Sequence, residues 1–130
     1  MSCILISGGF GYIGSHTATL LSEKNQKYVI VDNFSNCKRE IVDKISTITK
    51  NKVCYYDCDI RDYKNLIKII NENKVTSVIH FAALKSVSES IVNPFEYYEV
   101  NVNGTISLLK AMQLTGVKKF LFSSSAAVYG

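Results

Sequence analysis

Residues 7–14 read Ser-Gly-Gly-Phe-Gly-Tyr-Ile-Gly, between a short apolar segment and a longer segment typical of a helix. Two registers fit this stretch, Gly8-x-x-Gly11-x-x-Gly14 and Gly9-x-Gly11-x-x-Gly14. In such a loop one glycine allows a sharp turn, one lets backbone N–H groups approach phosphates, and one lets the helix pack closely on the sheet. The free N–H groups and the dipole of the first helical turn favour an anion. The stretch therefore predicts a site for a nucleotide pyrophosphate, and a glycine-rich turn without a ligand is the alternative.

The segments around this loop complete a strand, helix and strand. Residues 3–6 and 28–31 are short apolar runs typical of buried parallel strands, and residues 12–24 predict the helix between them. Together they match the ~30 residues of a dinucleotide-binding unit, in which an acid, here Asp32, follows the loop by about 20 residues. A carboxylate there can accept hydrogen bonds from both hydroxyls of an adenine ribose and repels a 2′-phosphate; an ordinary strand-end acid is the alternative. A P-loop is excluded, because no Gly-Lys-Ser/Thr closes the stretch.

The rest of the chain alternates predicted helices and strands. In order, these are a helix over 37–49, a strand over 53–56, a helix capped by Asp62, a strand over 77–82, a helix from Pro94 to the C-cap Gly116, and a strand over 120–122. The inner face of the long helix is predicted at Tyr98, Val102, Ile106, Leu109 and Met112. This alternation predicts an α/β fold with a Rossmann-like, doubly wound parallel sheet of order 3-2-1-4-5. Ligands bind such sheets at the carboxyl ends of the strands.

Composition indicates one globular domain. The 130 residues are 47% hydrophobic and 20% charged, which suffices for one compact core and leaves no room for a second full domain. The net charge of +4 is modest and the lysines are scattered, so no nucleic acid partner is expected. No apolar run approaches the ~18 residues of a membrane span, and no basic leader precedes the first strand. We therefore expect a cytoplasmic protein with no membrane contact.

Cysteines and histidines do not predict a metal site. The four cysteines, Cys3, Cys37, Cys54 and Cys58, include no Cys-x-x-Cys pair. Cys54 and Cys58 are predicted to share one face of a strand, which favours buried reduced thiols over zinc ligands. His16 and His80 lie on different elements with no second ligand nearby in the sequence, so both are expected to be structural.

Six motifs run through the chain in order. They are Gly-Gly-Phe-Gly-Tyr-Ile-Gly-Ser-His-Thr (8–17), Asp-Asn (32–33), Asp-Ile-Arg (59–61), His-Phe-Ala-Ala-Leu-Lys (80–85), Asn-Val-Asn-Gly-Thr (101–105) and Ser-Ser-Ser-Ala-Ala-Val-Tyr-Gly (123–130). Together they resemble the extended short-chain dehydrogenase/reductase family, most closely its UDP-galactose (UDP-glucose) 4-epimerases. The resemblance implies an isomerase of galactose metabolism that holds NAD throughout turnover and acts on a UDP-hexose. In that family NAD accepts a hydride from carbon four of the sugar and returns it to the opposite face of the keto intermediate, while the protein supplies orientation and electrostatics.

The resemblance also assigns site residues. Its glycine loop places Gly8, Gly11, Tyr12, Ile13 and Gly14 on the pyrophosphate. The other cofactor contacts that it implies are Asp32, Asn33, Ser35 and Asn36 around the adenosine ribose, Asp59 and Ile60 beside adenine, and Phe81, Ala82, Ala83 and Lys85 beside the nicotinamide. Ser125 corresponds to the catalytic serine or threonine that hydrogen-bonds the reacting sugar hydroxyl, and Lys85 and Ser125 are the implied substrate contacts. The alternatives are a solvated loop lysine for Lys85 and a polar strand end for Ser125.

The chain departs from the family pattern in two places. Val100 stands where these epimerases usually have an asparagine that contacts the cofactor, which leaves Asn101 as the nearest amide. The family's general base is the tyrosine of a Tyr-x-x-x-Lys motif, and the sequence stops at Gly130 before that motif. We therefore expect residues 1–130 to be the N-terminal part of a NAD-binding Rossmann domain, truncated before its sixth strand. Without the substrate domain, this part is expected to bind nucleotide but to be inactive alone.

Other functions stay open at this point. Nucleotide-sugar 4,6-dehydratases usually have Asp-Glu where this chain has Ala126-Ala127, which argues against dehydration. UDP-glucuronate epimerases and decarboxylases are harder to separate, because their selectivity depends on the substrate domain. An alternative of another class is a non-catalytic NAD-binding or interaction module, in which the fifth strand would be an uncovered edge. Family members commonly pair through helices that here would include residues 94–115, so a homodimer is also expected.

Overall fold

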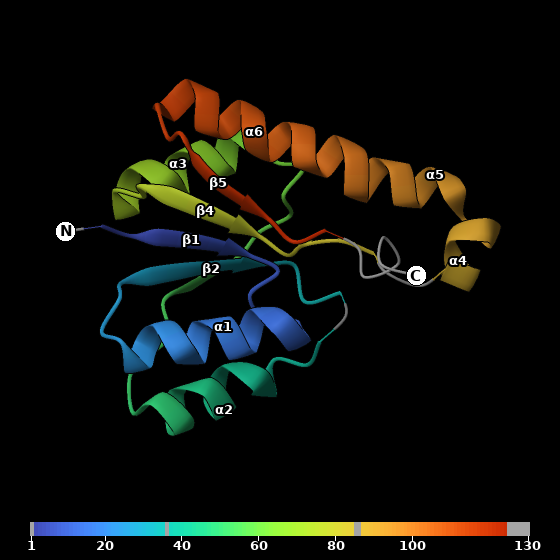
Figure 1. Cartoon of the computed structure of the whole chain (residues 1–130). Coiled ribbons are helices and arrows are strands. Elements are labelled where there is room, and N and C mark those ends of the chain that lie inside the picture. The colour runs from blue at the N-terminus through green and yellow to red at the C-terminus, as the bar shows by residue number, and fades with distance from the viewer. Residues whose placement is uncertain (1, 36, 85–86, 125–130) are drawn as a thin grey trace.

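The structure, a computed structural model, describes residues 2–35, 37–84 and 87–124 (Figure 1). Within these residues, five parallel strands form one sheet in the order β3-β2-β1-β4-β5. The strands are β1 (Ile4–Ser7), β2 (Tyr28–Asp32), β3 (Tyr55–Asp57), β4 (Ser77–His80) and β5 (Lys119–Phe122). The helices are α1 (Tyr12–Glu23), α2 (Glu40–Thr49), α3 (Tyr63–Asn73), α4 (Val87–Val92), α5 (Pro94–Tyr97), the π-helical η1 (Tyr98–Asn103) and α6 (Gly104–Thr115). The predicted doubly wound α/β fold is confirmed.

Helices cover both faces of the sheet, with α1 and α2 on one side and α3 and α6 on the other (Figure 1). Because successive side chains of a strand point to opposite faces, neighbouring residues enter different cores. Leu5 and Val29 lie opposite each other in the core under α3 and α6. Ile6 and Ile30 form the corresponding pair in the core under α1 and α2. Burial on both faces explains why these strands are continuous apolar runs.

Several predicted boundaries were wrong where the chain crosses the carboxyl ends of the strands. Helix α2 begins at Glu40 and not at residue 37, because Cys37 lines a pocket and the Arg39 guanidinium pairs with Asp57 at the end of β3. Strand β3 is likewise shifted toward the carboxyl side of the predicted 53–56. Strand β4 ends at His80 and not at residue 82, because the Ala82 N–H turns toward β1. The residues at these boundaries are placed by contacts at the carboxyl ends of the strands, and not by the regular hydrogen bonding of a helix or strand.

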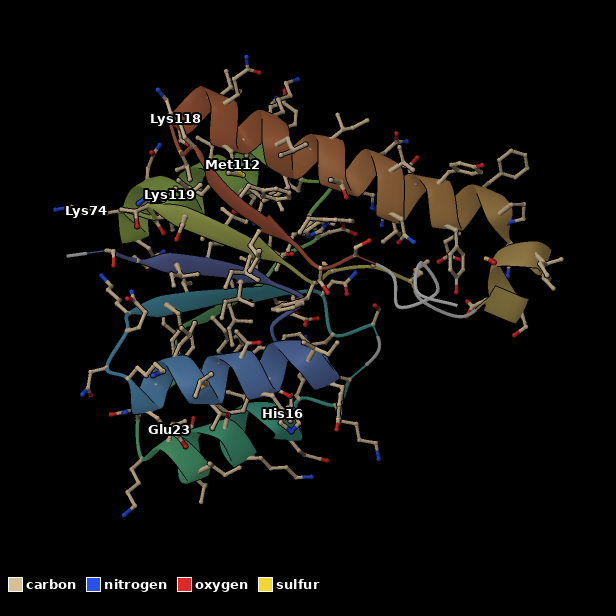
Figure 2. All side chains as sticks on the ribbon, in the orientation of Figure 1. His16, Glu23, Lys74, Met112, Lys118 and Lys119 are labelled. Carbon is tan, nitrogen blue, oxygen red and sulfur yellow. The ribbon has the colours of Figure 1, made fainter. Side chains whose placement is uncertain are left out.

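The long helix presents a different face to the core from the predicted one. Its buried residues are Gly104, Ser107, Leu108, Ala111 and Met112. Of the predicted inner face, Tyr98, Val102, Ile106 and Leu109 are 67%, 46%, 56% and 42% exposed. Met112 alone was predicted correctly, and Figure 2 shows it on the side of α6 that faces the sheet. The close approach of α6 to Ile60 determines which face of the helix is buried, because a Cβ on Gly104 would lie only 2.6 Å from Ile60 Cδ1. The wider turns of η1 also break the 3.6-residue period on which the prediction rested.

The cysteines are free thiols in different surroundings. Cys3 and Cys58 are buried as expected, but Cys54 is exposed and Cys37 is only partly buried. The prediction that Cys54 and Cys58 share a strand face was wrong, because β3 begins after Cys54 and ends before Cys58. Burial raises the pKa of the Cys58 thiol to about 11, so this thiol stays protonated at neutral pH.

The described part of the chain lacks two further features. No three His, Cys, Asp or Glu side chains in this part of the chain gather as a metal site. None of the helices described here has the length and apolar character that crossing a membrane requires.

Candidate functional site

A pocket of about 390 Å³ opens at the carboxyl ends of the central strands. This is the edge at which a sheet of this order reverses, between β1 and β4. All predicted cofactor residues that the structure describes line it: Gly8, Gly11, Tyr12, Ile13, Gly14, Asp32, Asn33, Ser35, Asp59, Ile60, Phe81, Ala82 and Ala83. The remaining predicted site residues, Asn36, Lys85 and Ser125, lie outside the described residues. The fold thus brings the predicted residues to one place, while their individual roles stay predictions.

Close backbone contacts shape the glycine loop. Gly8 has a φ of +67°, and a Cβ there would lie 2.7 Å from the Ala82 nitrogen. A Cβ on Gly14 would lie 2.4 Å from the Gly8 carbonyl oxygen, so α1 packs directly on the loop. Gly9 is constrained from the opposite side, because its Cβ would lie 2.6 Å from Ile30 Cγ2. Both predicted glycine registers therefore contain positions that a side chain would disrupt.

Gly11 has a different part in the loop. A Cβ there would meet the Gly8 carbonyl oxygen at 3.4 Å, an ordinary contact. Gly11 is the N-cap of α1, and it lines the pocket together with Tyr12, Ile13 and Gly14 of the first turn. The first N–H groups of a helix have no acceptor within it and carry its positive dipole end. The beginning of α1 can therefore receive an anionic group.

Asp32 connects the two loops beside the pocket. Its Oδ2 accepts a hydrogen bond from the Phe10 N–H at 3.1 Å, and its Oδ1 accepts one from the Phe34 N–H at 2.8 Å. Phe34 is held at a φ of +60°, an uncommon conformation for a residue with a side chain. The carboxylate also lines the pocket, so its oxygens combine a structural role with the capacity to accept further bonds from a ligand.

An aromatic cluster lies behind this end of the pocket, and sequence analysis missed it. The ring centroids of Phe10 and Phe34 are 5.1 Å apart, and Tyr55 packs edge-on against Phe10 at 5.5 Å. The Arg39 guanidinium stacks over the Phe34 ring at 4.4 Å. The three rings come from separate segments, so no sequence spacing could indicate the cluster.

Asp59 is held as an ionised acceptor in the pocket wall. Its Oδ1 accepts bonds from the Arg61 N–H at 2.9 Å and from Arg61 Nε at 3.0 Å, and its Oδ2 accepts one from Nη2 at 2.6 Å. These hydrogen bonds from Arg61 keep the pKa of the Asp59 carboxyl below its usual range. The 59–61 motif therefore fixes a carboxylate orientation beside the pocket.

Residues 81–84, here called the β4 pocket segment, form the wall beyond the glycine loop. The Leu84 N–H donates to Asn101 Oδ1 at 2.8 Å, and Asn101 Nδ2 donates to the Leu84 carbonyl at 2.9 Å. Val100, and not Asn101, lines the pocket. The sequence left Asn101 as the nearest amide to this position, and the structure pairs that amide with the Leu84 backbone.

Both histidines bond to the protein, as a structural role requires. His80 is 2% exposed, and its two ring nitrogens contact the Ser7 hydroxyl and, at 2.9 Å, the Thr105 hydroxyl. Burial lowers the pKa of His80 to about 4, so the ring is neutral at pH 7. His16 is exposed on α1, and its Nδ1 lies 2.7 Å from the Tyr12 carbonyl oxygen (Figure 2).

Lysines gather at the opposite end of the sheet. Figure 2 shows Lys74, Lys118 and Lys119 close to the amino ends of β4 and β5. None of the three lines the pocket at the carboxyl ends. An anion held in the described part of the pocket therefore does not depend on these lysines.

A doubly wound parallel sheet, a glycine loop that opens into a helix and a carboxylate ending the next strand define a dinucleotide-binding domain of the Rossmann type. The family model described as GDP-mannose 4,6 dehydratase matches residues 5–130. The chain belongs to this family, and the predicted resemblance to UDP-glucose 4-epimerases is confirmed by its relatives.

Two curated relatives illustrate the similarity. A UDP-glucose 4-epimerase of Klebsiella pneumoniae is 45% identical over 98% of this chain and 91% of the relative. One of Yersinia enterocolitica is 50% identical over 98% of this chain, but only 38% of the relative is covered. The chain therefore spans well under half the length of many relatives that it matches.

Solved structures show the same fold. UDP-glucose-4-epimerase from Stenotrophomonas maltophila, with bound NAD and formylated UDP-arabinopyranose, superposes with a TM-score of 0.96 at 42% identity. The match covers 100% of this chain and 39% of that one. The enzyme from Bifidobacterium longum, in complex with NAD+ and UDP, gives 0.94 at 42% identity over 99% of this chain and 38% of that one.

Proposed function

We propose that this chain is the NAD-binding part of an enzyme that interconverts UDP-galactose and UDP-glucose by transient oxidation at carbon four of the sugar. The observation that carries the proposal is the single pocket in which the glycine loop, Asp32 and the β4 pocket segment meet. The similar enzymes with bound NAD support the choice of cofactor, and the names of the relatives support the reaction. A cytoplasmic location remains a prediction from the sequence, and a place in galactose metabolism remains a prediction from the resemblance.

The residues present fit a dinucleotide. The strand order places Asp32 at the end of β2, the glycine loop after β1 and the β4 pocket segment after β4, in a row along one edge. If Asp32 holds one ribose and the start of α1 holds the pyrophosphate, the second half of the dinucleotide extends over the β4 pocket segment. The glycine loop can have this conformation only because Gly8 and Gly14 lack side chains, since a Cβ on either would meet backbone atoms.

Each part of the pocket then has a separate task. NAD would supply the hydride acceptor and donor, and the chain would hold it in one orientation. In the proposed complex, Asp32, Asn33, Ser35 and Asn36 would bind the adenosine ribose, and Asp59 and Ile60 would contact adenine. Phe81, Ala82, Ala83 and Lys85 would contact the nicotinamide. Lys85 and Ser125 would contact the sugar, where Ser125 would hydrogen-bond the reacting hydroxyl. The general base that removes its proton belongs to a Tyr-x-x-x-Lys motif, which these 130 residues do not contain.

Two other functions are weaker candidates. Dehydration needs an acid and a base, and Ala126 and Ala127 can supply neither. A non-catalytic module would need a partner for β5, which is an edge of the described sheet and exposes Leu121 and Phe122 by 62% and 54%. Binding of NAD without a UDP-sugar site in the intact protein would favour the module.

The proposed role of Asp32 predicts selectivity for NAD over NADP. Calorimetric titration of the full chain should give clearly tighter binding of NAD, because Asp32 accepts from the ribose hydroxyls and repels a 2′-phosphate. Asp32→Asn should weaken NAD binding by about 2 kcal/mol, the usual loss for a hydrogen bond to a charged group. It should also reduce the preference for NAD over NADP. The matched control is Asp43→Asn, which removes an exposed carboxylate from α2. Equal binding of NAD and NADP by the unmodified chain would contradict the role given to Asp32.

The exposed apolar face of the long helix supports a homodimer. Phe95, Tyr98, Val102, Ile106 and Leu109 are 88%, 67%, 46%, 56% and 42% exposed along α5, η1 and α6. A contiguous apolar surface of this kind is typical of a protein interface. We propose that a second copy of this chain covers it, as the family resemblance implies.

The dimer is tested by placing a charge on this face. Ile106→Glu should weaken self-association by about 2 kcal/mol, as expected for a central apolar interface residue. Light scattering across a concentration series measures the change. Ile48→Glu is the matched control, because Ile48 is a similarly exposed isoleucine on α2, at 66%. Monomers at all concentrations, or an equal loss in both variants, would argue against this interface.

A further inference from the structure

A network of polar side chains connects the ends of β1 and β4 to helix α6. Ser7 at the end of β1 is 0% exposed, and His80 at the end of β4 is 2% exposed. Their side chains contact each other, and His80 Nε2 lies 2.9 Å from Thr105 Oγ1 on α6. Burying the Ser7 and His80 side chains is unfavourable unless each is hydrogen-bonded, and the partly buried Thr105 completes the bonds of His80, so the network has a constrained geometry.

Each hydrogen bond in this network has a defined donor and a defined acceptor. Thr105 donates its single hydroxyl proton to the Asn101 carbonyl at 2.6 Å, so it must accept from His80 Nε2–H. The neutral His80 ring then has a bare Nδ1, which accepts from the Ser7 hydroxyl. Ser7 Oγ in turn accepts from the Ala82 N–H at 3.3 Å. The proton positions thus follow from the partners of each group.

Both ends of this network reach the β4 pocket segment. At one end Ser7 holds the Ala82 N–H. At the other end, Asn101 receives the Thr105 bond on its backbone and holds both polar groups of Leu84 with its side chain. The segment between Ala82 and Leu84 lines the pocket, so it is clamped at two points by the same set of bonds.

We infer that Ser7, His80, Thr105 and Asn101 are positioning residues that hold the β4 pocket segment in the conformation that receives the nicotinamide half of the dinucleotide. The inference rests on the proposed NAD-binding function. It assigns a task to residues that do not line the pocket themselves, and it gives the two halves of the pocket separate supports. The adenosine half depends on Asp32 and the loops it connects, whereas the other half depends on this network.

The first test uses the full chain without ligand and measures amide hydrogen exchange by NMR. Thr105→Val keeps the side-chain shape and removes the acceptor of His80 Nε2–H. It should speed exchange of the Ala82 and Leu84 amides about ten-fold, the effect of losing roughly one hydrogen bond. Thr105→Ser restores the hydroxyl and should restore slow exchange. Ser107→Ala is the matched control, because it removes a buried hydroxyl of α6 that has no hydrogen-bond partner in the described structure.

The second test compares NAD with ADP-ribose, which keeps the adenosine and pyrophosphate but lacks the nicotinamide. Thr105→Val should weaken NAD binding about ten-fold and change ADP-ribose binding by less than about two-fold. A merely structural role would weaken both ligands equally. Thr105→Ser should rescue NAD binding, and Ser107→Ala should leave both affinities unchanged.

Several outcomes would overturn the inference. Unchanged exchange at both amides in Thr105→Val, or equal losses of NAD and ADP-ribose, would show that the network does not position the segment for the nicotinamide half. Faster exchange in Ser107→Ala to the same degree would attribute the effect to general loosening of α6. If the unmodified chain bound neither ligand, the proposed function would fail, and the exchange rates would still decide whether the network holds the segment.

Discussion

Gly14→Ala should lower the free energy of unfolding by about 2 kcal/mol and abolish tight nucleotide binding. The added Cβ would lie 2.4 Å from the Gly8 carbonyl oxygen and 2.8 Å from Gly9 Cα, which are backbone atoms that cannot rotate away. Overpacking of this kind costs about 3 kcal/mol at the upper end of the usual range. Alanine recovers about 1 kcal/mol through its better helix propensity, so the clash prevails. Moving α1 off the loop would also displace the N–H groups that face the pocket.

Urea unfolding followed by circular dichroism measures the stability change, and titration with NAD measures the binding. Gly11→Ala is the matched control, because its Cβ meets the same Gly8 oxygen at 3.4 Å without a clash. Its stability should stay within about 0.5 kcal/mol of the unmodified chain. Equal destabilisation by the two substitutions would mean that the close approach of α1 to the loop does not determine stability.

Acidification should destabilise the chain through His80. Its pKa is about 4 in the folded protein because the ring is buried, against about 6.5 when the chain is unfolded. The unfolded state therefore binds the proton more readily between these values. Stability from this residue is complete above about pH 6.5 and falls as the pH drops toward 4, by about 3 kcal/mol in total. Protonation also removes the acceptor at Nδ1 that the Ser7 hydroxyl uses.

Urea unfolding at a series of pH values from 4 to 7.5 tests this expectation. Carboxylates with lowered pKa values, such as Asp59, contribute acid lability in the same direction, so a variant must isolate the histidine. His80→Gln should be less stable at pH 7 but should show a flatter profile between pH 4 and 6.5. His16→Gln, which changes an exposed histidine of α1, is the matched control. An unchanged slope of stability against pH in His80→Gln would show that the protonation of His80 does not differ between the folded and unfolded states.

The short apolar segments typical of strands and the spacing of the glycines were enough to predict the order of the sheet and the position of the pocket. Buried parallel strands need continuous apolar sequence, and the right-handed crossover rule leaves few ways to order them. The predicted pocket residues were recovered because they directly follow strands whose carboxyl ends meet at one edge. These features depend on local patterns and on chain connectivity.

The core face of the long helix could not be predicted in the same way. Periodicity favoured the more apolar stripe through Val102 and Ile106, but the buried stripe contains Gly104 and Ala111. Small residues were selected by the distance between α6 and the neighbouring Ile60, which no helical pattern encodes. The larger apolar residues remain outside, where the proposed second copy would cover them.

By itself the sequence determined the fold class and the strand order, because these follow from short-range patterns, and its family resemblance supplied most of the residues around the pocket. The tertiary structure alone decided how they are held. It showed that Asp32 ties two loops together, that Asn101 pairs with Leu84, and that Ser7 and Thr105 meet through His80. The residues of that last set lie 25 and 73 positions apart. Hydrogen bonds across such separations depend on the packing of whole elements, so only the folded chain reveals them.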